Sequence, residues 1–377
     1  MNYYIIAGEA SGDLHGSNLI KELHRIDRNA SVRCWGGDKM EAAGATLVKH
    51  YRELAFMGFV EVVKNLPTIF RNLAACKKDI LAYKPDALIL VDYPGFNLRI
   101  AAWAKQEGLK VIYYISPQVW AWKENRVKAI KRDVDKMLVI LPFEKEFYKK
   151  WNWEVEYVGH PLVEVIEEFK AGNLKSESRS LRDSAEILPI VALLPGSRKQ
   201  EILIKLPIML EVAKQFPRYS FVVAKAPGLP SAFYDELLKP YQNVSSVVDN
   251  TYELLNTASA ALVTSGTATL ETALFAVPEI ICYKGSNVSY QIAKRLIKIK
   301  YIGLVNLIMD KEVVKELIQD DLTVEKISIE LKQLLEDPAR KEALRKDYAN
   351  LKEILSQGGH ASENAASSIY QFITRTV

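Results

Sequence analysis

The stretch LVTSGTATLE at residues 262–271 joins an apolar run to a turn of small residues. It predicts a buried strand, a turn at Ser265, Gly266 and Thr267, and a helix that begins at this turn. Such a turn directs backbone N–H groups and the positive end of a helix dipole toward one point, which suits a diphosphate. Glu271, about one helical turn further on, can accept hydrogen bonds from a ribose. The stretch therefore predicts a nucleotide-sugar site and favours glycosyl transfer.

Short apolar runs alternate with helical periodicity along the whole chain, in two series. The runs predict strands at 3–7, 32–35, 87–92, 110–115, 137–141 and 155–158, and then at 190–194, 220–223, 244–248, 260–263 and 280–283. Helices are predicted between them, including 14–25, 67–83, 97–106, 125–131 and 144–150, and from 323 to the end with a break near 357–359. This alternation is typical of parallel sheets covered on both faces. The predicted fold class is α/β, with two doubly wound, Rossmann-like domains.

The segment 171–188 is polar and charged and predicts a linker between the two series. The domains are then 1–170 and 189–356, and a C-terminal helix within 357–377 can pack back on the N-terminal domain. Ligands of open parallel sheets bind beyond the carboxyl ends of the strands. Two such sheets that face each other place the predicted site in a cleft between the domains.

Composition narrows the class of protein. The chain has 377 residues, a net charge of +4, 49% hydrophobic residues and 25% charged residues, which exclude wholesale disorder. Three dispersed cysteines predict a reducing compartment rather than a disulfide framework. No signal segment or apolar run of about 20 residues is present, so a cytoplasmic protein, soluble or peripheral on a membrane, is expected. The five histidines lack ligand spacing, and neither a metal site nor a nucleic-acid partner is predicted.

Two acidic loops follow predicted strands of the first domain. In GEASGD at residues 8–13, Glu9 suits a sugar hydroxyl or proton transfer, Ser11 can contact substrate, and Asp13 is expected to cap the helix that follows. In LILVDYPGFN at residues 88–97, Asp92 ends an apolar strand, where partial burial can raise its pKa. Asp92 is then either a general base or a structural residue of the turn, and both interpretations stay open.

Further loops offer sugar and phosphate contacts. Trp120 and Trp122 in SPQVWAW at residues 116–122 can stack on a sugar or pack in the core. Arg198 in LPGSR at residues 194–198 offers a forked donor for a phosphate, although a surface arginine is the simpler alternative. The pattern is not that of an ATP-binding P-loop.

An apolar run at 54–60 precedes a helix with an apolar stripe, which Lys64, Arg71, Lys77 and Lys78 flank. Bases beside an apolar face fit a membrane interface, whereas core packing is the ordinary explanation for such a stripe. The helix 289–300, with Lys294, Arg295, Lys298 and Lys300, can add to a basic surface.

Together these stretches resemble the lipid-A-disaccharide synthase family of Gram-negative bacteria, which has the GT-B architecture. The resemblance covers essentially the whole chain. GEASGD and SPxVWAW are specific to the family, whereas the SGT…E pattern is shared with other UDP-sugar transferases. The stretches that carry the resemblance lie at residues 8–13, 57–62, 92–97, 116–122, 141–144, 159–161, 193–198 and 265–271.

The resemblance implies an inverting transferase that joins UDP-2,3-diacylglucosamine to 2,3-diacylglucosamine 1-phosphate (lipid X). The products are a β-1,6-linked disaccharide 1-phosphate of lipid A biosynthesis and UDP. It implies a catalytic acid/base at Asp92, an essential Glu9, no metal or other cofactor, and peripheral attachment to the inner face of the inner membrane, with an oligomer left open. The first domain then binds the acceptor and the membrane, and the second binds the UDP-sugar. The implied binding residues are Ser11, Asn97, Arg198, Ser265, Gly266, Thr267, Glu271 and Asn306.

Two positions depart from the family pattern. Gly95 stands where the family has a second acid, and Val305 precedes Asn306 where a proline is common. The alternatives are another UDP-sugar transferase, such as the peptidoglycan-pathway GlcNAc transferase, or a non-catalytic nucleotide-sugar-binding protein. The two acids of GEASGD argue against the first alternative, and an intact Asp92 and Glu9 argue against the second.

Overall fold

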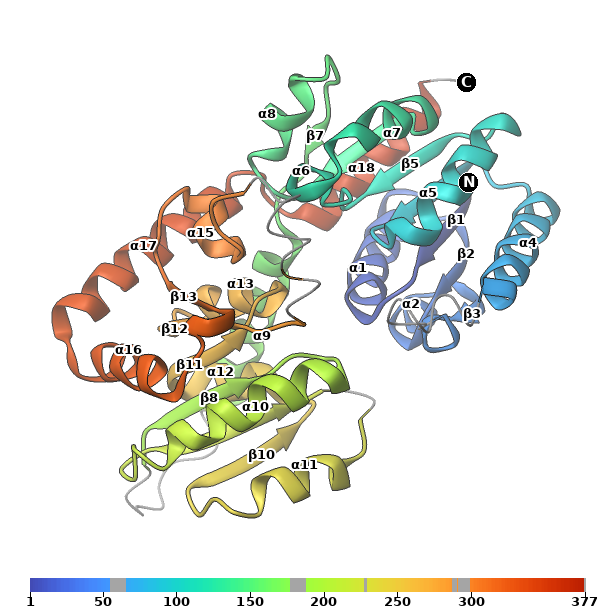
Figure 1. The fold of residues 1–377 in the computed structure, drawn as a ribbon. Helices are drawn as coiled ribbons and strands as arrows, with labels where there is room; N and C mark the ends of the chain where they lie inside the picture. Colours follow the sequence, from blue (N-terminus) through green and yellow to red (C-terminus); the bar gives the residue numbers. More distant parts are fainter. Residues whose placement is uncertain (55–65, 177–187, 227–228, 287–289, 291–298, 376–377) are drawn as a thin grey trace. The chain divides into compact units, whose positions relative to one another are not determined.

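The computed structural model describes residues 1–54, 66–176, 188–226, 229–286, 290 and 299–375. These residues form two compact units, each an α/β unit with a parallel sheet (Figure 1). Unit 1 consists of Met1–Pro161 and Leu355–Val377, and unit 2 of Leu162–Ile354. The sequence assigns residues up to 170 to the first domain, whereas the structure places Leu162–Ile354 in unit 2.

Unit 1 is built on a parallel sheet with the strand order β3-β2-β1-β4-β5-β6-β7. The strands are β1 (Asn2–Ala7), β2 (Ser31–Gly36), β3 (Thr46–His50), β4 (Ala87–Val91), β5 (Val111–Tyr114), β6 (Lys136–Val139) and β7 (Glu156–Tyr157). The helices are α1 (Ala10–Ile26), α2 (Asp38–Ala42), α4 (Leu66–Tyr83), α5 (Pro94–Gln106), α6 (Val119–Trp122), α7 (Val127–Asp133), α8 (Glu144–Lys149) and α18 (Ala361–Thr374). Short 3-10 turns lie at η1 (Tyr51–Glu53) and η2 (Glu124–Arg126).

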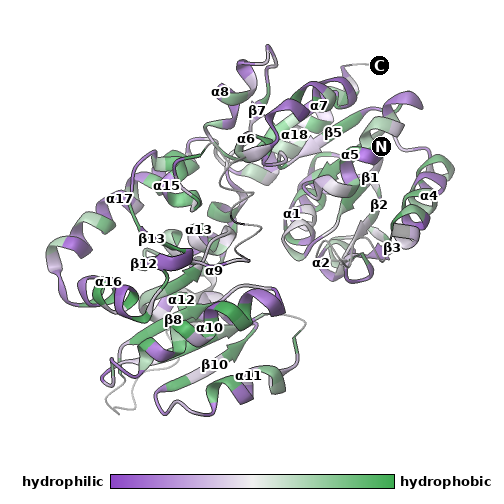
Figure 2. Ribbon diagram, viewed as in Figure 1, coloured by the Kyte–Doolittle hydropathy of each residue, from purple (hydrophilic) through white to green (hydrophobic). Residues whose placement is uncertain are grey.

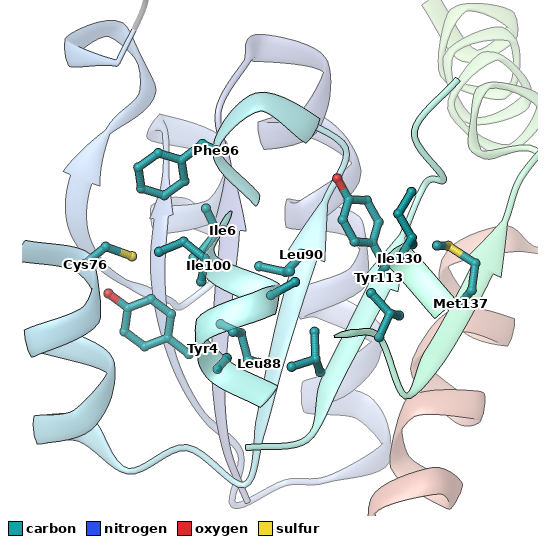
Figure 3. Packing of buried hydrophobic residues seen from close by; sticks show 14 of the residues in the cluster. Tyr4, Ile6, Cys76, Leu88, Leu90, Phe96, Ile100, Tyr113, Ile130 and Met137 are labelled. Atoms are coloured by element: carbon teal, nitrogen blue, oxygen red, sulfur yellow. The ribbon is translucent and has the colours of Figure 1, made fainter. Parts of the chain in front are cut away.

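Alternate residues of the strands supply the cores on the two faces of this sheet. Tyr4 and Ile6 of β1 pack with Leu88 and Leu90 of β4, under α4 and α5 (Figure 3). Tyr3 and Ile5, on the opposite face, pack with α1 and α18. Because both faces are covered, the central strands β4 and β5 are buried along their whole length, with the sequences ALILV and VIYY.

The C-terminal helix α18 belongs to unit 1, where it packs against α1. Ala365, Ile369 and Ile373 of α18 share a core cluster with Leu19 and Ile20 of α1. The small residues of α18 allow this close approach of the two helices.

Unit 2 has a parallel sheet with the strand order β10-β9-β8-β11-β12-β13. The strands are β8 (Ile190–Leu194), β9 (Ser220–Lys225), β10 (Val244–Val248), β11 (Ala258–Thr264), β12 (Glu279–Tyr283) and β13 (Lys315–Ile318). Around them lie α9 (Pro161–Ser176), α10 (Lys199–Ala213), α11 (Ser231–Leu238), α12 (Thr251–Thr257), α13 (Thr267–Leu274), α15 (Leu304–Met309), η4 (Gln319–Asp321), α16 (Val324–Glu336) and α17 (Pro338–Ser356). Hydrophobic residues gather along β8 and β11, whereas α17 has mixed polarity (Figure 2).

Two edge strands, β3 and β13, are missing from the sequence prediction. Both have charged residues within runs of four or five, KELI in β13 and TLVKH in β3. Edge strands are covered on fewer sides than central ones, so they need no continuous apolar run. Their composition therefore gives little periodic signal.

Candidate active site

Asp92 directly follows β4 in a backbone conformation that side chains rarely adopt. The φ angles of Asp92 and Tyr93 are 44° and 48°, in the left-handed region. The carbonyl oxygen of Asp92 accepts hydrogen bonds from Asn97 Nδ2 at 2.8 Å and from the Tyr113 hydroxyl at 2.6 Å. Surrounding side chains thus hold a strained loop in place, a pattern common at functional sites.

The carboxyl of Asp92 is poised for proton transfer near neutral pH. Burial, and secondly the neighbouring charge of Glu9, raise the pKa of Asp92 to about 7. A hydrogen bond from the backbone of Tyr93 opposes the rise. A group with a pKa near the working pH can act efficiently as a general base.

Glu9 lies at the N-terminal end of α1, close to the Asp92 loop. Gly8 packs directly on the ring of Tyr93, since a Cβ on Gly8 would come within 2.3 Å of that ring. A residue larger than glycine would push the two loops apart. The helix begins at Ala10, earlier than the sequence predicts, and Ser11 is exposed in its first turn. The structure therefore brings Glu9 and Asp92 together, with Ser11 nearby in the sequence.

Asp13 does not cap the helix that follows it, contrary to the sequence prediction. It lies inside α1 and its carboxylate faces the start of α2. It accepts backbone hydrogen bonds from Gly37 at 2.7 Å, Lys39 at 3.1 Å and Met40 at 3.1 Å. Asp13 thus connects α1 to the loop after β2, and its role is structural.

Asn97, which the resemblance places among the binding residues, is fully buried. Its Nδ2 donates to the carbonyl oxygens of Val91 at 3.2 Å and Asp92 at 2.8 Å, and lies 3.4 Å from that of Ile6. Asn97 therefore positions the Asp92 loop through hydrogen bonds from its side-chain amide to the backbone.

The tryptophans of SPQVWAW differ in environment. Trp120 is half-buried, and its Nε1 donates to Glu144 Oε1 at 3.2 Å. Glu144 is buried, and burial raises its pKa to about 7. Trp122 is exposed, with the Lys123 ammonium 3.8 Å from its ring centroid. Ile115, just before this segment, has a φ of 67°, which is strained for a β-branched residue. The segment is thus a second constrained loop at the carboxyl edge of the sheet.

In unit 2, the turn predicted from LVTSGTATLE lies between β11 and α13. Gly266 has a φ of 150° and nothing within 4 Å of a Cβ built on it. Gly266 and Thr267 are exposed, and α13 begins at Thr267. The start of α13 is therefore accessible to an anion at the carboxyl edge of the sheet.

Asn306, which the resemblance places on the UDP side, is fully buried. Its Nδ2 donates to Glu316 Oε1 at 2.9 Å and its Oδ1 accepts from the backbone of Val313 and Val314. Glu316 accepts from the backbone of Ile302 and Gly303, both at 3.0 Å.

This network reaches the turn after β11. The hydroxyl of Ser265 donates to the carbonyl oxygen of Ile302 at 3.1 Å. Asn306 and Glu316 therefore support Ser265 through the loop that contains Ile302, and both are positioning residues for the turn.

Glu271 is half-buried and accepts a hydrogen bond from the Tyr252 hydroxyl at 3.1 Å. Burial raises the pKa of Glu271, and the hydrogen bond from Tyr252 lowers it. The rings of Phe169 and Phe275 pack against Tyr252 with centroids 5.4 Å and 5.3 Å away. These contacts give a fixed orientation to Glu271, the residue that the sequence assigns to the ribose of a nucleotide.

Arg198 precedes α10 with its side chain 54% exposed. Its Nη1 donates to Glu201 Oε1 at 3.1 Å. Gly196, in the same loop, has a φ of 111°, which favours glycine. The structure therefore places the Arg198 guanidinium at the carboxyl end of β8, the strand that pairs with β11.

Sequence reasoning missed several residues that organise these loops. The sequence spacing does not indicate which residue each of them supports. These residues are Tyr93, Glu144, Tyr252 and Glu316. Only Tyr93 is adjacent in the sequence to the residue that it supports, Asp92. An aromatic residue next to an acid at the end of a strand is therefore the one pattern that could have indicated such a role.

Some predicted features lie outside the described residues. These are residues 55–60 of the apolar run, the 57–62 stretch, Lys64, Lys294, Arg295, Lys298 and residues 177–187 of the linker. Among the residues that the structure describes, no helix is long and apolar enough to cross a membrane. Within the same residues, no group of three or more His, Cys, Asp or Glu side chains lies close enough to hold a metal.

Comparison with solved structures defines the fold. A UDP-GlcNAc 2-epimerase from Neisseria meningitidis bound to UDP-GlcNAc is similar over 100% of both chains, with a TM-score of 0.68 and 13% identity. The calicheamicin glycosyltransferase CalG4 is similar over 100% of this chain and 99% of its own, with a TM-score of 0.60 and 16% identity. The fold, with its two Rossmann-like units, is the GT-B fold of such glycosyltransferases and epimerases.

The sequence comparisons are more specific. Residues 3–372 match the lipid-A-disaccharide synthetase family. The lipid-A-disaccharide synthase of Geobacter metallireducens is 41% identical over 98% of this chain and 96% of its own. That of Legionella pneumophila, synthase 1, is 38% identical over 98% of this chain and 96% of its own. The chain belongs to the lipid-A-disaccharide synthase family, and is a glycosyltransferase of lipid A biosynthesis.

Proposed function

We propose that this chain transfers 2,3-diacylglucosamine from its UDP conjugate to the 6-hydroxyl of 2,3-diacylglucosamine 1-phosphate. The products are the β-1,6-linked disaccharide 1-phosphate and UDP, with inversion at the anomeric carbon. The observation that carries the proposal is Asp92, a strand-end carboxyl with a pKa of about 7 beside Glu9. Membership of the family supports the choice of substrates.

Asp92 is the general base of the proposed reaction. Its carboxylate accepts the proton of the acceptor 6-hydroxyl as the oxygen attacks the anomeric carbon. The bond between that carbon and the UDP oxygen breaks in the same displacement, and UDP leaves with the electron pair. Glu9 favours a basic Asp92, because its negative charge makes proton uptake by Asp92 easier.

The donor binds at the carboxyl edge of the unit 2 sheet. The start of α13 and the guanidinium of Arg198 stabilise the diphosphate, on which negative charge develops as the bond breaks. Glu271 accepts hydrogen bonds from the ribose. The bound UDP-GlcNAc of the Neisseria epimerase shows that this fold accommodates a UDP-sugar in that protein. The proposal requires the donor sugar to reach Asp92 of unit 1.

Both proposed substrates have fatty acyl chains, so the enzyme works at a membrane surface. Helix α4 exposes Phe70 and Leu81, which are 62% and 48% exposed. Lys77 and Lys78 lie on the same helix. An apolar and basic helix surface of this kind fits an anionic bilayer on the cytoplasmic face.

Charge reversal tests the membrane role. We expect Lys77→Glu with Lys78→Glu to weaken binding to anionic vesicles by at least about 30-fold, since each base near such a surface contributes about 1 kcal/mol and the loss of two removes about 2 kcal/mol. Turnover of detergent-dispersed substrates should change much less. The matched control is Lys149→Glu with Lys150→Glu at the end of α8. Equal losses in vesicle binding and detergent turnover, or equal effects of both pairs, would count against α4 as the docking helix.

Product analysis tests the chemistry. Wild-type enzyme is incubated with both lipids, and the disaccharide is examined by mass spectrometry and NMR. A β-linked product joined through the 6-position supports the proposal. An α-linked product, or a different linkage, refutes the inverting mechanism or the acceptor hydroxyl, respectively.

A further inference from the structure

Lys205, on α10 of unit 2, has a side chain that is only 3% exposed. Lysine is almost never fully buried unless it is paired with a negative charge. Glu201 Oε2, one helical turn earlier, lies 3.8 Å from Lys205 Nζ. A buried cation therefore lies behind the loop that leads into α10.

The same carboxylate serves a second cation. Glu201 Oε1 accepts the hydrogen bond from Arg198 Nη1 at 3.1 Å. Glu201 Oε2 also lies 2.8 Å from the position of a Cβ on Gly196, so the carboxylate packs against the loop that ends β8. Arg198 and Lys205 thus share one carboxylate, and the group of three has a net positive charge.

The two residues of β12 that lie close to this group, Cys282 and Tyr283, add no negative charge to it. Cys282 of β12 faces Lys205, and burial raises the pKa of its thiol to about 12. Burial, and secondly the charge of the nearby Glu201, raise the pKa of the Tyr283 hydroxyl, so this residue is also neutral at physiological pH. The excess positive charge lies at the carboxyl end of β8, where the proposed function places the diphosphate.

We infer that Lys205 is a positioning residue of the donor site, which neutralises Glu201 so that Arg198 can exchange Glu201 for the diphosphate. The inference rests on the proposed function. When the donor binds, Arg198 turns from Glu201 to the phosphate oxygens. Glu201, whose side chain is 32% exposed, then keeps the buried Lys205 beside it as its cationic partner.

Removal of Lys205 has two consequences for the loop. Without Lys205, Glu201 keeps only Arg198 as a cationic partner in the group. When Arg198 then turns to the phosphate, the Glu201 carboxylate is left without a cation, which is costly in a partly buried site. That carboxylate also repels the diphosphate. Both effects weaken the binding of a diphosphate, and neither acts on the uridine part.

Calorimetric titration with UDP and with uridine separates these effects. We expect Lys205→Met to weaken UDP binding by about tenfold, the size of one charge interaction of about 1.4 kcal/mol, and to leave uridine binding within about twofold. Lys205→Arg retains the charge and should restore UDP affinity. Glu201→Gln should bind UDP at least as tightly as the wild type, and the double variant Glu201→Gln, Lys205→Met should recover most of the loss.

Lys214→Met, at the exposed end of the same helix, is the matched control, because Lys214 pairs with Glu211 at 2.8 Å outside the site. In the transferase assay, Lys205→Met should raise the donor KM more than it lowers kcat. Equal losses of UDP and uridine affinity, or no recovery in the double variant, would overturn the role of Lys205. A wild-type protein that binds neither ligand would instead overturn the proposed function, and the inference with it.

Discussion

The substitution Glu9→Gln tests the coupling between the two acids at the centre of the proposed mechanism. It removes one negative charge and keeps the shape of the side chain. The pKa of Asp92 is raised from 3.8 to about 7, chiefly by burial and secondly by the charge of Glu9. This rise corresponds to about 4 kcal/mol between the two protonation states.

The share of Glu9 can be estimated from Coulomb's law. At an effective dielectric constant of about 20, two carboxylates repel by about 4 kcal/mol at about 4 Å and by about half of that at about 8 Å, and solvent screening reduces this to about 1–2 kcal/mol. One pH unit corresponds to about 1.4 kcal/mol. We therefore expect Glu9→Gln to lower the pKa of Asp92 by about one pH unit.

The assay is the pH dependence of kcat/KM for UDP release. Asp92 must be ionised to accept a proton, so activity falls as the pH drops through its pKa near 7. In Glu9→Gln this acidic limb should move to lower pH by about one unit, whatever happens to the maximal rate. Glu107→Gln, at the far end of α5, is the control and should leave the limb in place. An unchanged limb in Glu9→Gln would refute the electrostatic coupling.

Three further substitutions test separate parts of the account. Asp92→Asn should lower kcat by about 10²–10⁴-fold with UDP affinity unchanged by calorimetry; near wild-type turnover would show that another group takes the proton. Tyr252→Phe removes the hydrogen bond to Glu271 and should weaken UDP binding by about tenfold, which calorimetry measures against an unchanged Tyr241→Phe control. Glu279 is fully buried at the start of β12, and burial raises its pKa well above the ordinary value. Below the pKa that Glu279 has in the unfolded chain, the residue is protonated in both states and its ionisation costs no stability. As the pH rises from there toward the pKa of Glu279 in the folded protein, the unfolded chain loses its proton first and the folded state is destabilised. Glu279→Gln should therefore raise the melting temperature by about 2–4 °C at pH 8 and have little effect near pH 4; the same gain at both pH values would contradict ionisation as the cause.

The central strands and the strand-end loops were predictable from the sequence because apolar runs such as 87–91 and 190–194 have a single physical explanation. They are long enough for a strand and too short for a buried helix. The residue types at their ends, Asp92 and the small residues at 265–267, then suggest chemistry. The positions of both groups follow from the rule that parallel strands present their carboxyl ends on one edge.

The roles of Asn97 and Asn306 could not be predicted in the same way. An asparagine after a strand has the same sequence signal whether its amide faces a ligand or the backbone, and only the fold shows that both are buried. The same holds for Glu201 and Lys205, whose i, i+4 spacing is typical of an exposed helix pair. Here α10 packs against α16, and Lys205 lies close to Cys282 of β12. The burial of Lys205 is therefore a property of the tertiary structure.

The most direct test of the account is UDP release by the wild-type enzyme in EDTA, with UDP-2,3-diacylglucosamine as donor, in the presence and absence of 2,3-diacylglucosamine 1-phosphate. We predict rapid release only when both lipids are present, because Asp92 takes its proton from the acceptor and Arg198 with the start of α13 stabilises the leaving diphosphate. No release with both lipids, from folded protein that binds UDP, would contradict the proposed transfer.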